Sequence, residues 1–248
     1  MPALQAVAPR DPRRRSRAPG AAAALTRERI LQAALDLVAE DGLAQLSTRR
    51  LGQRLGCEAM SIYHHYPNKH HLLDAMVDHV VASFEAPPPG LAPLERLRLA
   101  MFAFRATAHR YPAMFPLVAV HRLNTPTGVR WIESILTLVQ DVVSDPERAA
   151  RHFRNLGYFL TGAALDETSG YARGPSAADP VDNAFIAREC PRLAAASRYF
   201  DSSQWNATFE LGVRTMLDAV QRDATAPPAP PPAPGGARKN RRSPQATR

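Results

Sequence analysis

The chain lacks several features that would each indicate a particular class of protein. No apolar run reaches the roughly 18 residues that a membrane-spanning helix needs. The basic N-terminus is not followed by the apolar stretch of a signal peptide. Its only two cysteines, Cys57 and Cys190, cannot build a disulfide framework and have no metal-ligand spacing, so we expect both to be small buried apolar side chains. These absences favour a cytoplasmic globular protein.

Positive charge is abundant but unevenly placed. The 248 residues carry a net charge of +8. Residues 1–25 hold five arginines against one aspartate, and residues 224–248 hold five basic residues and no acid, which leaves 26–223 slightly negative. The overall charge is therefore weak evidence for specific DNA binding. One alternative is that the basic tails coat nucleic acid without sequence preference, and deletion of the tails would then abolish binding.

Changes in composition divide the chain into four segments. Pro, Ala and Arg without apolar periodicity predict a disordered basic arm over 1–24, and the Pro-rich basic end predicts a disordered tail over 224–248. The run Pro87-Pro88-Pro89-Gly90 marks a boundary within the remaining residues, 25–223. We therefore expect one small domain over 25–85 and a larger one over 90–223.

Both domains show helical periodicity, and no alternating strand pattern is present. Thr26 is a good N-cap for the first helix, and Thr125-Pro126 and Asp145-Pro146 are typical helix starts. The sequence thus predicts an all-α protein, with helices over 26–40, 47–55, 58–65, 69–84, 93–110, 112–122, 126–143, 146–171, 181–198 and 203–222.

Two of the short helices, 47–55 and 58–65, are separated by a turn at Gly56, which is the arrangement of a helix-turn-helix. Apolar residues Leu51, Leu55, Cys57 and Ile62 are expected to pack the two helices together. The second helix is short enough to lie in a major groove and to present its N-terminal half to base edges. The N-terminal domain is therefore predicted to bind DNA.

The residues of this segment resemble the N-terminal domain of the tetracycline-repressor (TetR/AcrR) family. The resemblance covers about 26–80 and rests on Ser-Thr-x-x-Leu, then Leu-Gly-x-x-x-x-Ile-Tyr-x-His-Tyr-x-x-Lys-x-x-Leu-Leu. The stretch from Phe209 to Asp218 resembles the last helix of the tetracycline-repressor-like subgroup. The resemblance implies a ligand-responsive transcriptional regulator, by default a repressor, that binds a palindromic operator as a homodimer, is released by a small molecule and needs no cofactor.

The same resemblance implies roles for residues of the helix-turn-helix. Thr48, Tyr63 and Lys69 match phosphate-contacting positions, and Arg49 matches a position that reaches a base edge, where arginine prefers guanine. His65 matches a position that fixes the helix or reaches phosphate, and Ala59 or Met60 would contact a thymine methyl group. The full implied DNA-binding set is Thr48, Arg49, Ala59, Met60, Ser61, Tyr63, His64, His65 and Lys69.

Two departures from the family pattern concern metal binding and helix packing. Gly52 stands where the family usually has alanine, at a cost of up to about 1 kcal/mol, and we interpret it as permitting close packing. The pairs His64-His65 and His70-His71 are unusual, but adjacent helical residues point about 100° apart and do not converge on one ion. We therefore predict no metal site there and expect exposed or DNA-facing histidines.

The second domain is implied to bind the effector and to dimerise. Candidate pocket residues are Phe102, Met114, Phe115, His121, Trp131, Ile135, Tyr158 and Thr161, which combine bulky apolar groups with a few polar ones. Candidate dimer-interface residues are Phe153, Leu156, Leu160, Ala164, Trp205, Phe209, Val213 and Met216. Every one of these residues also suits an ordinary core. Pro116 aligns with the metal-ligating histidine of the tetracycline repressors, so a tetracycline–magnesium effector is not expected, although His121 lies nearby.

An enzyme is the remaining alternative. The sequence has no Gly-x-Ser-x-Gly motif, no phosphate-binding loop and no paired metal-ligand motif. The adjacent acids Asp166 and Glu167 end a predicted helix, where we expect them to be solvated rather than catalytic. The sequence therefore predicts a regulator without enzymatic activity.

Overall fold

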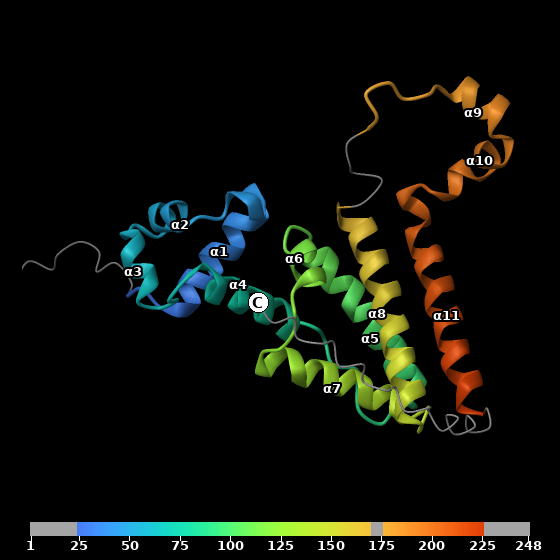
Figure 1. Cartoon of the computed structure of the whole chain (residues 1–248), viewed down its shortest axis with the longest axis horizontal. Helices are drawn as coiled ribbons and strands as arrows, with labels where there is room; N and C mark the ends of the chain where they lie inside the picture. The colour runs from blue at the N-terminus through green and yellow to red at the C-terminus, as the bar shows by residue number, and fades with distance from the viewer. Residues whose placement is uncertain (1–23, 170–175, 226–248) are drawn as a thin grey trace, which may run out of the picture.

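The computed structural model describes residues 24–169 and 176–225, and within them every regular element is a helix (Figure 1). This agrees with the predicted all-α class. Nearly all of the expected N-terminal arm and C-terminal tail lies outside the described residues, as do residues 170–175, which include the end of the helix expected over 146–171.

The first group of helices contains α1 (Arg27–Asp41), α2 (Thr48–Leu55), α3 (Ala59–Tyr63) and α4 (Lys69–Ala82), with a short 3₁₀ turn at Leu43–Gln45. Three of these helices begin at a side-chain cap. Thr26, Ser47 and Asn68 each accept a hydrogen bond from the backbone N–H three residues on, which satisfies one otherwise unpaired donor of α1, α2 and α4. Local sequence therefore sets where the motif helices start.

The larger group follows the segment that contains Pro87 to Gly90. It consists of α5 (Pro93–Arg110), α6 (Phe115–Val120), α7 (Pro126–Gln140), α8 (Pro146–Ser169), α9 (Asn183–Glu189), α10 (Pro191–Ala196) and α11 (Trp205–Ala224), with 3₁₀ turns at Ser197–Tyr199 and Ser202–Gln204. The prediction of a single helix over 181–198 is wrong, because the structure has two helices there, α9 and α10. Pro191 starts a new helix because the residue before a proline avoids helical geometry, and Cys190 has φ −131° and ψ 58°.

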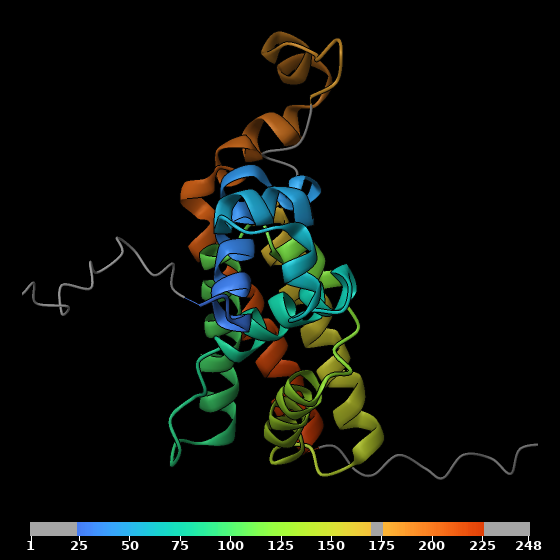
Figure 2. The same cartoon turned by 90° about the vertical axis from the view of Figure 1, so that its left-hand side faces the viewer.

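Figures 1 and 2 show how these elements are arranged. The α8 and α11 helices run side by side and pack on α5, and α7 packs across α5 and α8. The α4 helix passes from the first group to the second, where it contacts α6 and α7. The α9–α10 segment projects beyond the ends of α8 and α11 (Figure 1). The molecule therefore has two helical groups joined through α4.

Burial follows the predicted apolar stripes in most places. In α1, Ile30, Ala34 and Val38 are completely buried, as expected. The cysteines depart from the prediction, because both are only half-buried. Cys57 lies in the turn between α2 and α3, and Cys190 lies between two short, largely exposed helices, so neither position is enclosed by a core.

The pair of acids at the end of α8 also departs from the prediction. Asp166 is exposed as expected, but Glu167 is only 5% exposed. Its Oε2 atom accepts a hydrogen bond from Arg105 Nε at 2.7 Å and lies 2.6 Å from His109 Nε2. Glu167 is therefore a buried ion-pair residue that joins α8 to α5, a role that its place beside an exposed acid does not reveal.

Candidate nucleic-acid interface and effector pocket

The α2 helix is held on α1 by two ion pairs. Arg50 contacts Asp41 at 2.5 Å, and Arg54 contacts both carboxylate oxygens of Glu40 at 2.6 Å. Arg54 lowers the pKa of Glu40 below its ordinary value by donating to it. Arg49, between these anchors and the start of α2, is exposed and forms no hydrogen bond or ion pair with residues the structure describes. Its guanidinium is thus available to an external acceptor.

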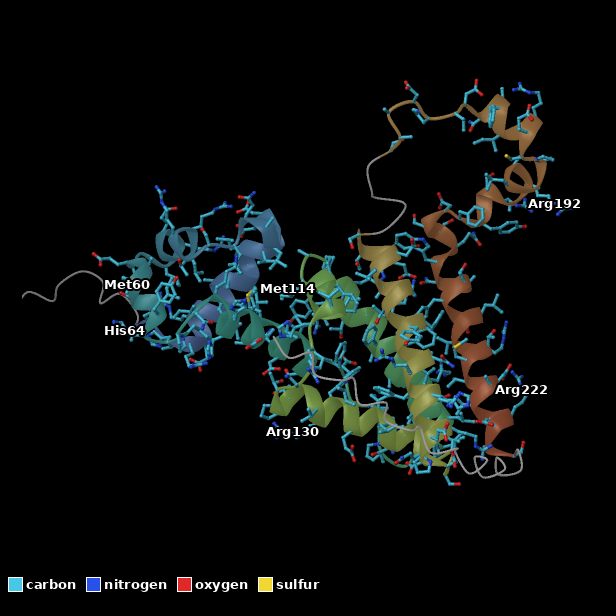
Figure 3. The ribbon with its side chains drawn as sticks, in the orientation of Figure 1. Met60, His64, Met114, Arg130, Arg192 and Arg222 are labelled. Atoms are coloured by element: carbon cyan, nitrogen blue, oxygen red, sulfur yellow. The ribbon has the colours of Figure 1, made fainter. Side chains whose placement is uncertain are left out.

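The α3 helix and its C-cap, His64, present part of the predicted DNA-binding set on the outside. Met60 is 66% exposed and Tyr63 is 36% exposed, and His64 is also exposed, whereas Ile62 is buried and holds the helix against the core. Met60 and His64 lie at the end of the molecule farthest from α8 and α11 (Figure 3). Four other members of the predicted set, Thr48, Ala59, Ser61 and His65, are half-buried, and Lys69 is exposed.

Two residues outside the predicted set fix the end of α3. The Arg27 guanidinium donates to the backbone oxygen of His65 at 2.8 Å and lies over the Tyr66 ring at 4.4 Å. The Tyr66 hydroxyl donates in return to the backbone oxygen of Arg27 at 3.2 Å, and burial raises the pKa of Tyr66. Sequence reasoning missed this contact between α1 and the residues that follow α3, because Arg27 and Tyr66 are 39 positions apart.

Lys69 is exposed and also forms a hydrogen bond within the chain. Its Nζ atom donates to the backbone oxygen of Leu46 at 2.9 Å, just before the α2 N-cap. An ammonium group has three donors, so this bond leaves two for a phosphate. The bond places Lys69 beside the start of α2, where Thr48 also lies.

The second group of helices encloses a cavity of about 180 Å³. Its walls come from α5, α6, α7 and α8, with Phe84 just beyond the end of α4. The Phe84 ring stacks on Phe104 with centroids 5.2 Å apart and lies 5.0 Å from the Trp131 ring. The lining residues are Phe84, Leu97, Ala100, Met101, Phe104, Val118, Ala119, His121, Leu123, Trp131, Ile135, Phe153, Leu156, Gly157, Leu160 and Thr161.

Four of the eight predicted pocket residues, His121, Trp131, Ile135 and Thr161, line this cavity. The other four do not. Met114 and Phe115 are buried in the core, Phe102 packs edge-on against Phe209, and Tyr158 is 63% exposed on α8. Periodicity identifies a buried helix face, but it cannot tell a cavity wall from a close-packed one.

Polar contacts connect the α4 helix to the ends of the cavity helices. Asp74 Oδ1 lies 2.9 Å from Nε2 of His121, the C-cap of α6, and Asp78 Oδ1 accepts from the hydroxyl of Thr125, the N-cap of α7, at 2.5 Å. The next residue of α4 is His79, and its Nε2 atom lies 3.3 Å from the hydroxyl of Tyr111, the C-cap of α5. Three residues of α4 thus contact the ends of three other helices.

The predicted dimer residues lie mostly inside the single chain. Leu156, Leu160, Ala164, Phe209 and Val213 are buried between helices of one chain, Phe153 lines the cavity, and Trp205 and Met216 are half-buried. Burial inside one chain leaves the first five no surface to offer to a second chain. The exposed sides of α8 and α11 carry other apolar residues, including Tyr158 and Leu211, at 63% and 54% exposure.

With this geometry established, comparison with known proteins identifies the family. Residues 30–76 match the model of the bacterial regulatory proteins of the tetR family, and residues 94–223 match the tetracyclin repressor-like C-terminal domain. The chain belongs to the TetR family. It is a member of a family of transcriptional regulators, and none of the helices in its described residues is long and apolar enough to cross a membrane.

Two curated relatives of this TetR-family chain illustrate the match. Tetracycline repressor protein class A from transposon 1721 of Escherichia coli is 26% identical over 203 residues, which cover 78% of this chain and 89% of the relative. The HTH-type transcriptional repressor DrrR1 of Streptomyces coeruleorubidus is 31% identical over 152 residues, or 58% of this chain and 54% of the relative.

A solved structure shares the architecture. Apo ActR from Streptomyces coelicolor is 26% identical, with a TM-score of 0.67, over 82% of this chain and 100% of the other. ActR has also been crystallised in complex with actinorhodin, and that structure aligns with a TM-score of 0.66 at 25% identity.

Proposed function

We propose that this TetR-family chain is a ligand-responsive transcriptional repressor that works in the cytoplasm. It binds a palindromic operator as a homodimer and is released by a small molecule, and it has no enzymatic activity. In this proposal residues 25–85 bind DNA and residues 90–223 bind the effector and dimerise. The relatives support the proposal, because they include tetracycline repressors and a regulator crystallised with a small molecule.

The observation that carries the proposal is the position of α4. At its N-terminal end, Leu72 and Met76 are buried with the helix-turn-helix core, and at its other end Phe84 forms part of the cavity wall. Asp74 and Asp78 of the same helix bind the ends of α6 and α7. A ligand that shifts the cavity walls would thus change the orientation of the DNA-binding helices through a short chain of direct contacts.

For DNA contacts, we propose that the exposed face of α2 and α3 enters the major groove. Arg49 reads guanine, Ala59 or Met60 contacts a thymine methyl group, and the remaining predicted residues either face bases or contact phosphate. The exposure of Arg49, Met60 and Tyr63 supports these roles. Arg27 and Tyr66 are added as positioning residues for α3.

For dimerisation, we move the proposed interface to the exposed sides of α8 and α11. A groove of about 250 Å³ lies between the two helices, lined in part by Asn155, Tyr158, Met216 and Ala219. An isologous contact through these helices would place two DNA-binding groups on one duplex, which matches a palindromic site. Tyr158 and Leu211 are the apolar side chains that we expect the second chain to cover.

The test is selection of binding sites from random duplex DNA by the full-length chain, followed by titration with the recovered site and a scrambled site. We expect an inverted repeat with at least about a thousandfold preference over the scrambled duplex. A chain without residues 1–23 and 226–248 serves as the comparison. If selection recovers no common sequence, or if tail removal abolishes binding to both duplexes, the basic tails bind nonspecifically and the proposal is wrong.

A further inference from the structure

The cavity favours a flat aromatic ligand of modest size. Its volume is about 180 Å³, and an apolar cavity of about 150 Å³ is known to hold benzene. The rings of Phe84, Phe104 and Trp131 are inclined to one another by 9° to 31°, so they form a stack of roughly parallel aromatic rings in the cavity wall. One or two fused rings would thus find both the space and an aromatic wall.

Few polar side chains line this cavity. Apart from the Trp131 indole, they are His121 and Thr161. The His121 Nε2 atom lies 2.9 Å from a carboxylate oxygen of Asp74. An ionised carboxylate only accepts hydrogen bonds, so Nε2 carries the proton of this contact. In the neutral ring Nδ1 is then an acceptor, and it makes no hydrogen bond with the residues described.

This arrangement distinguishes among oxygen-bearing ligands. A ligand hydroxyl can donate to Nδ1, whereas an ether oxygen has no hydrogen to give. A ligand carboxylate would place its oxygen, an acceptor, against Nδ1, which is also an acceptor. The negative charge of Asp74 on the other side of the ring would further oppose its binding. Asp74 thus selects for a neutral hydroxyl by fixing which nitrogen of His121 carries the proton.

We propose that the effector is a planar hydroxylated aromatic molecule and that His121 is the residue that recognises its hydroxyl group, oriented by Asp74. The inference rests on the proposed function, because it names the class of ligand that occupies the regulatory cavity. Thr161 on α8 supplies a second polar group, a hydroxyl, which can bind a further oxygen of such a ligand.

The experiment measures binding of four matched probes to the full-length chain by isothermal titration calorimetry at pH 8, without DNA. The probes are 1-naphthol, 1-methoxynaphthalene, naphthalene and 1-naphthoate. One hydrogen bond changes affinity by about three- to tenfold, so 1-naphthol should bind that much more tightly than 1-methoxynaphthalene, and 1-naphthoate should bind most weakly. Equal affinity of the first two probes, or tightest binding of 1-naphthoate, would overturn the proposal.

Two variants assign the preference to named residues. The His121→Phe chain should bind naphthalene as before but lose its preference for 1-naphthol. Asp74→Ala changes a half-exposed side chain outside the cavity, so the fold should persist while the preference shrinks because the His121 proton is no longer fixed. An undiminished preference in Asp74→Ala would contradict the role of Asp74 even if His121→Phe failed to fold.

These outcomes are separate from those of the DNA experiment. A chain that selects an inverted repeat but does not distinguish 1-naphthol from 1-methoxynaphthalene retains the proposed function and disproves the ligand class. A chain that distinguishes the probes but selects no DNA sequence retains the ligand class as a binding property and disproves the regulatory function.

Discussion

Gly52 lies so close to Cys57 that a Cβ atom on Gly52 would be 2.7 Å from the backbone carbonyl oxygen of Cys57. The Cys57 N–H donates to the Gly52 oxygen at 3.0 Å, so the backbone of the turn is bound directly onto α2. The neighbour is backbone rather than a flexible side chain, and it cannot move aside without moving the start of α3. Close packing therefore accounts for glycine at this position.

The first prediction is that Gly52→Ala weakens both the fold and DNA binding. Alanine gains about 1 kcal/mol in helix propensity, but overpacking costs about 1–3 kcal/mol and displaces α3. We expect lower stability in urea unfolding and weaker affinity for the selected duplex in fluorescence anisotropy. Gln53→Ala, at an exposed neighbouring position, is the control and should change neither. A more stable Gly52→Ala chain with normal affinity would show that the turn is adaptable.

The second prediction separates two adjacent arginines of α2. Arg49 is exposed without a partner among the described residues, whereas Arg50 is paired with Asp41. Arg49→Ala should lower affinity for the selected site by about 1–3 kcal/mol and remove the preference at one guanine. Arg50→Ala should leave every base preference intact. Binding to all single-base substitutions of the site gives the comparison, and unchanged preferences in Arg49→Ala would disprove the assignment.

Local signals in the sequence predicted the elements well, because caps and apolar periodicity act over a few residues. Thr26 and Thr125 cap helices in the structure as they were expected to. Residues that act across the fold were missed or misplaced. Arg27 contacts His65, and Glu167 contacts Arg105, over separations of 38 and 62 positions. No local pattern records which distant residue will face them.

The division between cavity, core and surface was also beyond the sequence. Phe115 and Trp131 are both bulky aromatic residues on apolar helix faces, yet one is fully buried in the core and the other lines the cavity. Tyr158 was expected in the cavity but is exposed on α8. Which side of a helix lines the cavity depends on how α5, α6, α7 and α8 pack together, and the sequence of one helix contains no information about that.

The third prediction concerns the buried carboxylate of Glu167. It joins Arg105 and His109 of α5, and Arg105 also donates to Asn206 of α11 at 2.8 Å. Glu167→Ala should destabilise the chain by about 3–5 kcal/mol, because it leaves the largely buried Arg105 guanidinium without its negatively charged partner. Asp166→Ala removes the adjacent, exposed acid and should cost no more than about 0.5 kcal/mol. Urea unfolding measures both, and equal effects would mean that the ion pair contributes little.

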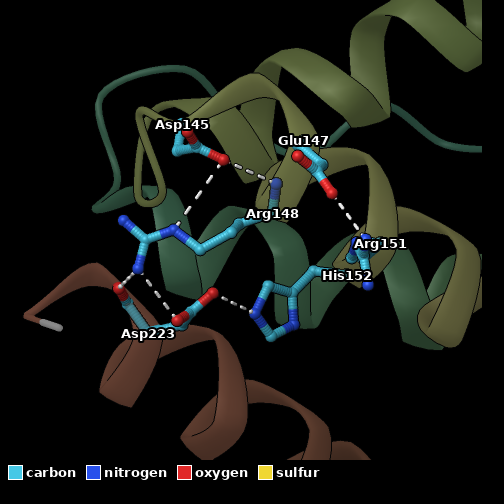
Figure 4. A network of polar contacts seen from close by, with 6 residues as sticks. All are labelled: Asp145, Glu147, Arg148, Arg151, His152 and Asp223. Atoms are coloured by element: carbon cyan, nitrogen blue, oxygen red, sulfur yellow. Dashed lines mark hydrogen bonds and ion pairs between the residues drawn. The ribbon is translucent and has the colours of Figure 1, made fainter. Parts of the chain in front are cut away.

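The fourth prediction is that the stability of the fold depends on pH through Asp223, near the C-terminal end of α11. Asp223 binds two residues near the start of α8, Arg148 at 3.1 Å and His152 at 3.0 Å (Figure 4). Burial raises the pKa of Asp223, but the hydrogen bond from His152 and the charge of Arg148 outweigh it, so the pKa falls below its ordinary value of 3.8. A carboxylate with a lowered pKa stabilises the fold above that ordinary value, and the stabilisation is lost as the pH falls through the folded-state pKa.

The measurement compares wild type with Asp223→Asn by urea unfolding at pH 6 and at pH 3. The wild type should be the more stable chain at pH 6, and the difference should shrink at pH 3, as the carboxyl group takes up a proton. Asp218→Asn changes an exposed acid of the same helix and is the control. A difference between wild type and Asp223→Asn that is independent of pH would mean that the charge of Asp223 is not what stabilises this end.

The last prediction concerns the proposed dimer interface on α8 and α11. Gly212 of α11 lies against the ring of Phe159 on α8, so the two helices pack closely and leave Leu211 pointing outward at 54% exposure. A charge at Leu211 should therefore spare the fold of each chain but oppose burial against a second chain. Leu211→Glu should elute as a folded monomer in light-scattering chromatography and lose most of its affinity for the inverted repeat, while binding to a single half-site persists. Val120→Glu, at an 81% exposed position on α6, is the matched control and should stay dimeric. A dimeric Leu211→Glu chain would place the interface elsewhere on the molecule.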